Sequence, residues 1–363
     1  FASMDNIINF VSCYFMKQKS AFMGLVAILS LTIALTPTLI DDASALKSPG
    51  VPQQKIAPET NHIVCGDILC IDVIDNSVRE VQEKTIKIEG LDVFYLEAGP
   101  SDAPTVLLLH GFPTSSHMFR NLVPELADEF HVIAPDMIGY GRSSMPTVDE
   151  FEYTFAHQTQ IIEQFTEKLG LDQYTLYVMD YGGPVGFRLF ENNPEKVQGF
   201  VIQNANAYDE GLEEFWDDWK VWWNDPTPEN ESKLHYLVAP DTTKWQYQFG
   251  MRNPDAVDPS NWITDQAGLD RPGNVAIQLA MAYDYRTNIP LYPQWQESFR
   301  EHQPPALIVW GANDYIFPAS GAHQYERDLE NVEKYLLDTG HFVLEEDLDF
   351  VAKQMRVFVN SIQ

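Results

Sequence analysis

Short apolar runs, rich in β-branched and aromatic residues, recur along most of the chain and limit its fold more than any other feature. Patterns typical of amphipathic helices separate several of the runs, as in residues 154–169. Strands that are apolar on both faces and alternate with helices predict a parallel sheet covered by helices on both sides. The runs occupy residues 105–109, 131–134, 174–178, 199–203, 306–310 and 333–337.

In a parallel sheet of this kind, functional residues lie at the carboxyl ends of the strands. Asp180 follows one run within Val178-Met179-Asp180-Tyr181-Gly182-Gly183, where small residues permit the tight strand–turn–helix of a nucleophile elbow. Asp314 and His341 follow the last two runs. Each residue alone is also explained by a structural role such as a helix cap. Nucleophile, acid and histidine in this chain order indicate a catalytic triad.

These three residues, together with His110-Gly111-Phe112-Pro113 upstream, resemble the α/β-hydrolase superfamily. More narrowly, they resemble its aspartate-nucleophile branch, which contains epoxide hydrolases and haloalkane dehalogenases. The resemblance covers residues 85–363 and implies an α/β fold, with a mostly parallel eight-stranded sheet, helices on both faces and an inserted helical cap. We therefore assign residues 85–205 and 301–363 to the two parts of the core, and residues 206–300 to the cap.

An aspartate in place of serine changes which bond the protein is expected to break. A serine that attacks a saturated carbon would leave an ether, whereas a carboxylate leaves an ester that water can hydrolyse. Asp180 therefore predicts substitution at saturated carbon, with His341 as the general base for water and Asp314 orienting the histidine. The resemblance implies that the backbone N–H groups of Phe112 and Tyr181 form the oxyanion hole, and we expect both residues to contact the substrate.

The leaving group distinguishes the two enzyme classes of this branch. An epoxide oxygen departs as an alkoxide and needs O–H donors, whereas a halide needs N–H donors and no proton. The His-Gly-Phe-Pro motif resembles epoxide hydrolases, whose caps carry two proton-donating tyrosines. By resemblance these are Tyr247, in a Tyr-Gln pair seven residues before Pro254, and Tyr285, within Tyr283-Asp284-Tyr285-Arg286-Thr287-Asn288. The sequence therefore predicts an epoxide hydrolase that opens a small apolar epoxide to a diol.

Other positions resemble haloalkane dehalogenases instead. Val178 and Pro113-Thr114-Ser115-Ser116 match that group, although the positions that carry its halide-binding Asn and Trp hold Phe112 and Tyr181 here. The cap also supplies many indole N–H groups, and we expect Trp245 to contact the substrate. Hydrolytic dehalogenation of a small halogenated substrate by the same triad is therefore an alternative. A catalytically silent hydrolase fold used for binding is a third.

The N-terminal residues 1–45 lack the core pattern. Met16-Lys17-Gln18-Lys19, the apolar run 21–40 and Ala43-Ser44-Ala45 are typical of an export signal. The run is also long enough for a membrane anchor, so we expect an exported protein with either a cleaved signal or a retained anchor. A spurious upstream extension of a soluble protein is the alternative.

Residues 46–84 are predicted to form a linker, in which Cys65 and Cys70 either form a disulfide loop or remain free thiols. The formal net charge of −30 repels phosphate backbones, so we expect no nucleic-acid partner. The sequence has no His-Glu-x-x-His, no Cys-x-x-Cys, no Gly-x-Ser-x-Gly and no dinucleotide fingerprint. We therefore expect no metal, no cofactor and no serine nucleophile.

Overall fold

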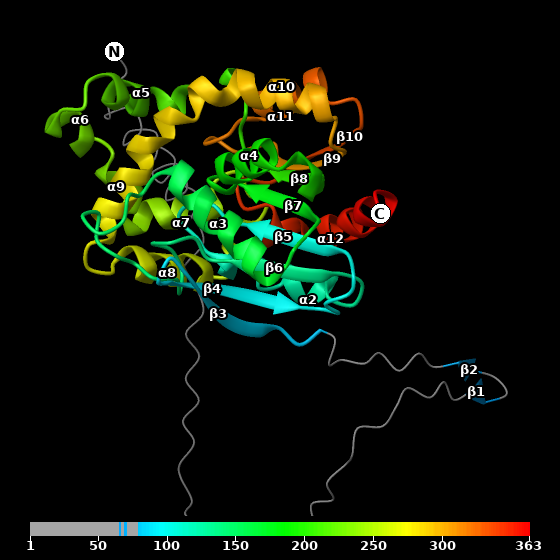
Figure 1. Ribbon diagram of the computed structural model, residues 1–363. Helices are drawn as coiled ribbons and strands as arrows, with labels where there is room; N and C mark the ends of the chain where they lie inside the picture. The colour runs from blue at the N-terminus through cyan, green and yellow to red at the C-terminus, as the bar shows by residue number, and fades with distance from the viewer. Residues whose placement is uncertain (1–64, 67–68, 71–78) are drawn as a thin grey trace, which may run out of the picture. The chain divides into compact units, whose positions relative to one another are not determined.

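The computed structural model describes residues 65–66, 69–70 and 79–363 (Figure 1). The chain divides into two compact units, Phe1–Ile68 and Leu69–Gln363, and the sheet and helices below all belong to the second. The signal or anchor expected within residues 1–45 lies outside the described residues. Cys65 ends up in the two-residue strand β1 (Cys65–Gly66) and Cys70 in β2 (Leu69–Cys70), and their disulfide stays a prediction.

The centre of the fold is an eight-stranded sheet with the order β10-β9-β8-β7-β5-β6-β4-β3, which confirms the expected fold class. β3 and β4, and β4 and β6, pair antiparallel, and the other neighbours pair parallel. The strands are β3 (Gln82–Ile88), β4 (Leu91–Ala98), β5 (Thr105–Leu109), β6 (His131–Pro135), β7 (Tyr174–Met179), β8 (Val197–Gln203), β9 (Ala306–Gly311) and β10 (Val332–Leu337).

One expected boundary is wrong. The linker predicted for residues 46–84 ends too late, because β3 already begins at Gln82 and pairs with β4 from there. The start of the strand was placed too late because its first side chains are polar and mostly exposed, as is typical of an edge strand. The core therefore extends at least from Gln82.

Helices cover both faces of the sheet, because its central strands are apolar on both sides (Figure 1). Neighbouring residues of β5 show this, because Leu107 belongs to the apolar cluster on one face of the sheet and Val106 to the cluster on the other face. The helices of the first face are α3 (Phe155–Leu169), α4 (Gly182–Asn192), α10 (Tyr292–His302) and α11 (Ala319–Asp328). Those of the second face are α2 (Leu122–Leu126) and α12 (Leu344–Ser361).

The chain between β8 and β9 forms a layer of short helices, in the region where we expected the cap. Its helices are α5 (Asp217–Asn224), α6 (Pro228–Ser232), α7 (Pro240–Gln248), α8 (Ser260–Leu269) and α9 (Asn274–Asp284). α10 lies within the expected range 206–300 but packs against α4 and α11, so the return to the core begins before residue 300. Polar contacts join cap and core: the indole of Trp216 donates to the carbonyl of Ile316 at 2.7 Å, and Asp284 accepts from the N–H of Phe155 at 2.8 Å.

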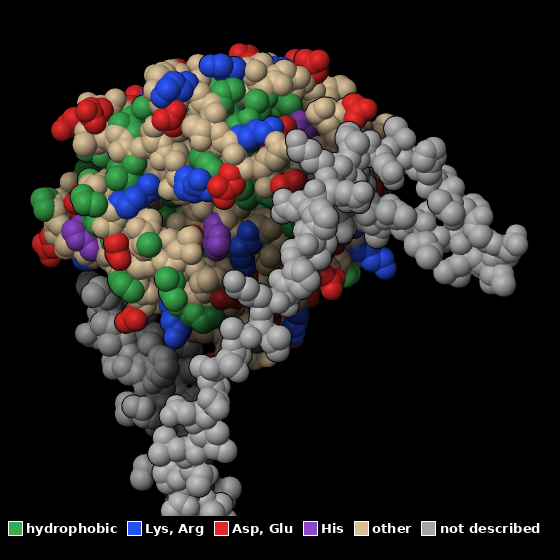
Figure 2. All heavy atoms as spheres, turned by 90° about the horizontal axis from the view of Figure 1, so that it is seen from below, with side chains coloured by type: hydrophobic (Ala, Val, Ile, Leu, Met, Phe, Trp, Pro, Cys, Tyr) green, Lys and Arg blue, Asp and Glu red, His purple; other side chains and the backbone are tan. Residues whose placement is uncertain are grey.

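The surface mixes charges of both signs. Figure 2 shows acidic and basic side chains interspersed on one face, where the negative charge of the chain is not gathered into one patch. Local pairs such as Arg356 with Asp128, at 2.6 Å, illustrate this mixing. No helix in the described part of the chain is both long enough and apolar enough to span a bilayer.

Candidate active site

Asp180 occupies a strained turn between β7 and α4. Its φ of 49° lies in the left-handed region that side chains other than glycine rarely adopt. Two glycines allow the close approach of neighbouring backbone: a Cβ at Gly182 would lie 2.3 Å from the carbonyl oxygen of Leu109, and one at Gly111 would lie 2.3 Å from the Cβ of Asp180. The turn therefore holds the carboxylate at the edge of the sheet, as the small residues after this strand predicted.

The two carboxylate oxygens of Asp180 have different surroundings. Oδ1 accepts hydrogen bonds from the backbone N–H groups of Phe112 and Tyr181, both at 2.6 Å. Oδ2 lies 3.9 Å from Nε2 of His341. Burial raises the pKa of Asp180 to about 6, while the charge of His341 and the two backbone donors pull it down. The carboxyl group is therefore mostly ionised at neutral pH.

His341 is held by Asp314. Its Nδ1 lies 2.7 Å from Oδ2 of Asp314, and Oδ1 of the same carboxylate accepts from the N–H of Ile316 at 2.8 Å. Burial alone would lower the pKa of His341, but the charge and hydrogen bond of Asp314 raise it above its ordinary value. Nε2 has no hydrogen-bond partner among the described residues and lies on the side of Asp180. The structure thus brings the three predicted residues together from the ends of three strands.

Asn204 is a polar residue of this site that the sequence reasoning missed. Its Nδ2 donates to Oδ2 of Asp314 at 2.7 Å, and its backbone carbonyl accepts from the N–H of Asp180 at 3.3 Å. It also has a left-handed φ of 41° and is completely buried. The signal was present, because Asn204 directly follows the apolar run 199–203, as the three predicted residues follow theirs.

A small cavity of about 20 Å³ lies next to Asp180. Phe112, Tyr181 and Trp245, which we expected to contact the substrate, all line it. Two of its further residues carry buried N–H groups without a partner in the described part of the chain, at Nε1 of Trp219 and Nε2 of Gln246. The remaining lining residues are Phe215, Trp216, Leu237, Thr242 and Ile316. The cavity is thus a small, mostly aromatic space with few polar groups.

Tyr247 does not lie where the predicted proton donor would have to be. Its hydroxyl donates to Oδ2 of Asp265 at 2.5 Å, and its ring stacks on Phe342 with centroids 3.9 Å apart. It does not line the Asp180 cavity, whereas Trp245 and Gln246 do. The physical reason is helical geometry: on α7 the side chain of residue 247 points about 100° away from that of residue 246.

Tyr285 does not line the cavity either, so its predicted role as a proton donor stays a prediction. It is completely buried, and its hydroxyl lies 3.5 Å from that of Tyr292. Its ring packs against two residues of the cavity wall, with centroids 4.6 Å from Trp216 and 5.9 Å from Tyr181. Tyr285 therefore lies behind the lining side chains, so neither predicted tyrosine lines the cavity.

Metal ligation has no support in the part of the chain that the structure describes. Within residues 79–363 and the two short strands, no group of three or more His, Cys, Asp or Glu side chains is placed to hold a metal ion.

Residues 104–348 match the family model described as alpha/beta hydrolase fold. The chain therefore belongs to the α/β-hydrolase family. It is 42% identical over 272 residues to a Saccharomyces cerevisiae protein named uncharacterized hydrolase YNR064C, a match that covers 74% of this chain and 93% of the yeast protein.

Matches to relatives of named activity are shorter or more distant. A haloalkane dehalogenase from Bradyrhizobium diazoefficiens is 37% identical over 123 residues, which is 34% of this chain and 39% of that protein. Among solved structures, haloalkane dehalogenase DbeA from Bradyrhizobium elkani has a TM-score of 0.65 at 21% identity, covering 78% of this chain and 99% of its own. Epoxide hydrolase CorEH has a TM-score of 0.64 at 20% identity, covering 78% and 100%. These structures share the fold. The chain is a hydrolase of this fold, and about a third of its sequence is similar to haloalkane dehalogenases.

Proposed function

We propose that the protein hydrolyses a carbon–heteroatom bond at a saturated carbon through an ester on Asp180. The difference between the two oxygens of Asp180 supports this most directly. Oδ2 attacks the carbon, a C–O bond forms, and the leaving group departs with the electron pair of the broken bond. Oδ1 then becomes the carbonyl oxygen of the ester, already between the N–H groups of Phe112 and Tyr181.

Water completes the reaction. Nε2 of His341 takes a proton from a water molecule, whose oxygen attacks Cγ of Asp180. Negative charge gathers on Oδ1, where the two backbone donors stabilise it. The Cγ–Oδ2 bond breaks and the product alcohol leaves with Oδ2 and the proton from His341, while the water oxygen stays in the restored carboxylate. The second proton of the water goes to solvent when the leaving group is a halide, or returns to the O–H donor that protonated an epoxide oxygen. Asp314 stabilises the positive charge of His341 during this step.

Two leaving groups are compatible with this mechanism, and a different feature favours each. The N–H groups of Trp219 and Gln246 in the cavity wall suit a halide, which needs donors and no proton. An epoxide needs an O–H donor, and Tyr285 is the candidate, because its ring packs directly behind Tyr181 and its hydroxyl has only a long contact with Tyr292. The wall as it stands favours the halide, whereas the His-Gly-Phe-Pro motif favours the epoxide.

Trapping the ester tests the mechanism. His341→Ala is incubated with a small haloalkane and with a small epoxide, and the protein is weighed and digested. We expect an adduct on the peptide that contains Asp180, formed by the compound of the true substrate class. The matched control, Asp180→Asn with His341→Ala, should form none. An adduct that persists in this control, or none with any member of a broad panel while the wild-type protein turns the same panel over, would contradict the mechanism.

We also propose that the protein is exported by the leader-like segment within residues 1–45. Expression of the full chain in a eukaryotic host, followed by fractionation and N-terminal sequencing, tests this. A secreted product that begins near Ala45 supports a cleaved signal, and a membrane-bound one supports an anchor. Retention of a soluble product inside the cell would contradict both.

A further inference from the structure

The backbone of His341 is held from inside the core by the side chain of Gln203. This glutamine is the last residue of β8, and its Nε2 donates to the carbonyl oxygen of His341 at 3.0 Å. That carbonyl oxygen accepts no other hydrogen bond within the part of the chain that the structure describes. Gln203 is completely buried. The ring of His341 is thus held by Asp314, and its backbone by a single amide side chain.

Tyr177 sets the orientation of the Gln203 amide. In the pairing of β7 with β8, Tyr177 lies opposite Val201 and Met179 opposite Gln203, so the tyrosine and the glutamine project from the same face of the sheet. The hydroxyl of Tyr177 donates to Oε1 of Gln203. A carbonyl oxygen can only accept, so Nε2 of the amide must face His341 and Oε1 must face the hydroxyl. Every donor and acceptor in this arrangement therefore has one possible role.

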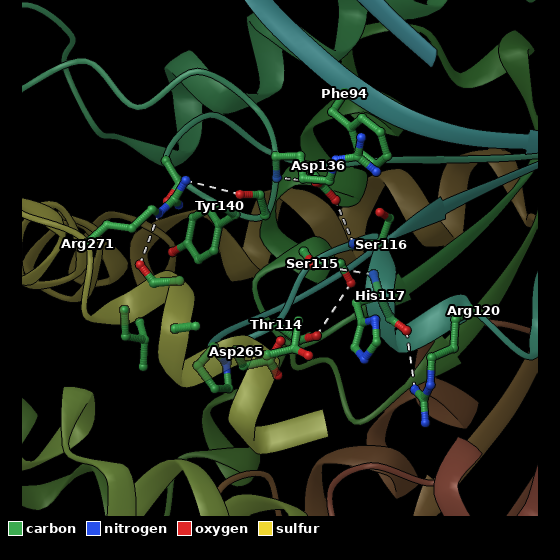
Figure 3. A pocket seen from close by; sticks show the side chains of 18 of the residues that line it. Phe94, Thr114, Ser115, Ser116, His117, Arg120, Asp136, Tyr140, Asp265 and Arg271 are labelled. Carbon is green, nitrogen blue, oxygen red and sulfur yellow. Dashed lines mark hydrogen bonds between the residues drawn. The ribbon is translucent and has the colours of Figure 1, made fainter. Parts of the chain in front are cut away.

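The ring of Tyr177 is fixed in turn by the segment that follows β5. Phe119 contacts this ring edge to face, with centroids 5.3 Å apart and planes at 82°. Phe119 ends the short helix η1 (Ser116–Phe119), whose first residue donates its N–H to Oδ1 of Asp136 at 2.7 Å (Figure 3). Both aromatic side chains are completely buried. Tyr177 is therefore a fixed point in the core from which Gln203 is oriented.

The surroundings of these two polar side chains favour a positioning role over a contribution to stability. Tyr177 lies in an apolar cluster that includes Phe119, Val201 and Leu307. A buried hydrogen bond adds little to the free energy of unfolding, and an apolar pair of the same shape is about as stable. An apolar pair would not fix the carbonyl group of His341 in one direction. Burial also raises the pKa of Tyr177 well above its ordinary value, so its hydroxyl remains a donor at every working pH.

We propose that Tyr177 and Gln203 are positioning residues for His341. Together they fix the backbone of the histidine, so that its Nε2 stays within reach of a water molecule beside the ester on Asp180. This inference rests on the proposed function, in which His341 activates that water. The carboxylate of Asp180 is held separately, by two backbone N–H groups. Loss of the positioning residues should therefore slow hydrolysis of the ester and leave its formation nearly unchanged.

Single-turnover kinetics test this difference between the two steps. Gln203→Met removes the amide, whereas Tyr177→Phe keeps the amide and removes its hydroxyl partner. The probes are 1-bromobutane and 1,2-epoxybutane. With the one that the wild-type protein turns over, we expect each variant to slow ester hydrolysis by roughly 2- to 12-fold, the worth of one net hydrogen bond. The double variant should be no slower than Gln203→Met, because Tyr177 acts only through Gln203.

Thr175→Val is the matched control. Thr175 is another completely buried polar residue of β7, and its Oγ1 has no hydrogen-bond partner among the described residues. This variant should leave the rates of both steps unchanged. Thermal unfolding shows which variants are folded, and the milder Tyr177→Phe carries the test if Gln203→Met does not fold. Equal slowing of ester formation and hydrolysis overturns the inference.

A second measurement needs no substrate and so separates this inference from the proposed function. Nδ1 of His341 lies 2.7 Å from Oδ2 of Asp314, and the proton between them is expected to give a low-field ¹H NMR signal, which His341→Ala assigns. We expect Gln203→Met and Tyr177→Phe to move or broaden this signal and Thr175→Val to leave it in place. An unchanged signal in both variants overturns the inference. If the wild-type protein forms no ester, the proposed function fails, and this signal alone decides whether the two residues position His341.

Discussion

The core and the cap place functional side chains by different physical means. In the core, Asp180, Asp314 and His341 each follow a strand, and parallel pairing of those strands brings them to one edge of the sheet. In the cap, the side chains that face the cavity are chosen by the rotation and packing of short helices. A strand-end residue therefore has its place fixed by its neighbours in sequence, whereas the place of Tyr247 depended on how α7 packs on Phe342.

The largest effect should come from the core. Asp180→Asn removes the nucleophile, and we expect turnover to fall by a factor on the order of 10⁴ or more. Its thermal stability should stay equal or rise, because the variant replaces a buried charge with a neutral side chain of the same shape. Turnover assays and thermal unfolding check the two halves separately. Wild-type turnover in this variant would show that the core triad is not the reacting centre.

Asn204 tests whether a strand-end residue without direct chemistry still matters. Asn204→Ala removes a hydrogen bond to the ionised Asp314, and we expect kcat to fall roughly 10- to 150-fold. Asp314 would also orient His341 less well, so the acid limb of the kcat profile should move, which a purely structural defect would not cause. Asn204→Ser restores a donor and should recover part of the rate. An unchanged pH profile in Asn204→Ala would remove Asn204 from the positioning network.

A matched pair of cap variants tests the leaving group. Trp219→Phe removes an N–H from the cavity wall, and Tyr285→Phe removes an O–H from behind it. If the substrate is a halide, we expect Trp219→Phe to slow ester formation roughly 2- to 12-fold and Tyr285→Phe to leave it nearly unchanged. The reverse ranking is expected for an epoxide. Single-turnover rates of ester formation measure the effect of each variant. Equal effects of the two variants on both substrates would contradict the different roles of Trp219, in the cavity wall, and Tyr285, behind it.

The acid limb of the pH profile reports on the core. The pKa of Asp180 is raised to about 6, and the attacking form is the carboxylate, so kcat/KM should fall as the pH drops through about 6. The raised pKa of His341 acts in the same direction on ester hydrolysis, because only the neutral imidazole accepts a proton from water. Steady-state rates between pH 4.5 and 8 check this. A profile that stays flat down to pH 5 would contradict a buried nucleophile with a raised pKa.

A separate effect concerns the stability of the cap. Burial raises the pKa of Asp265 to about 7, above its unfolded value of about 3.9. The folded state therefore holds this proton more tightly, and its contribution to stability is lost as the pH rises from about 4 through 7. Asp265→Asn should flatten this dependence in urea unfolding. Tyr247→Phe removes a hydrogen bond that lowers the pKa of Asp265, so it should extend the dependence to higher pH, and it should cost about 1–3 kcal/mol. If Tyr247→Phe turns over epoxides and haloalkanes at the wild-type rate, this supports the position of Tyr247 outside the active site.

Much of the core site was predictable, and the reason is local. Small residues after a buried strand led to Asp180, and chain order led to Asp314 and His341. The same rule would have found Asn204, but an amide after a strand suggested no chemistry by itself. Motif spacing in the cap was less informative, since Tyr247 and Tyr285 fit the epoxide hydrolase pattern but neither lines the cavity. The start of the edge strand at Gln82 was placed too late because its first side chains are polar and mostly exposed.

The order of residues along the chain was enough to predict the α/β fold, the strand ends that carry the triad and the aromatic character of the cap. A buried run of apolar residues has few ways to pair, so local pattern and sheet topology agree. Which cap side chains face Asp180 depends on the packing of the cap helices, which brings together residues far apart in the chain. A shift of one residue along a helix turns a side chain by about 100°, enough to move it into or out of the cavity.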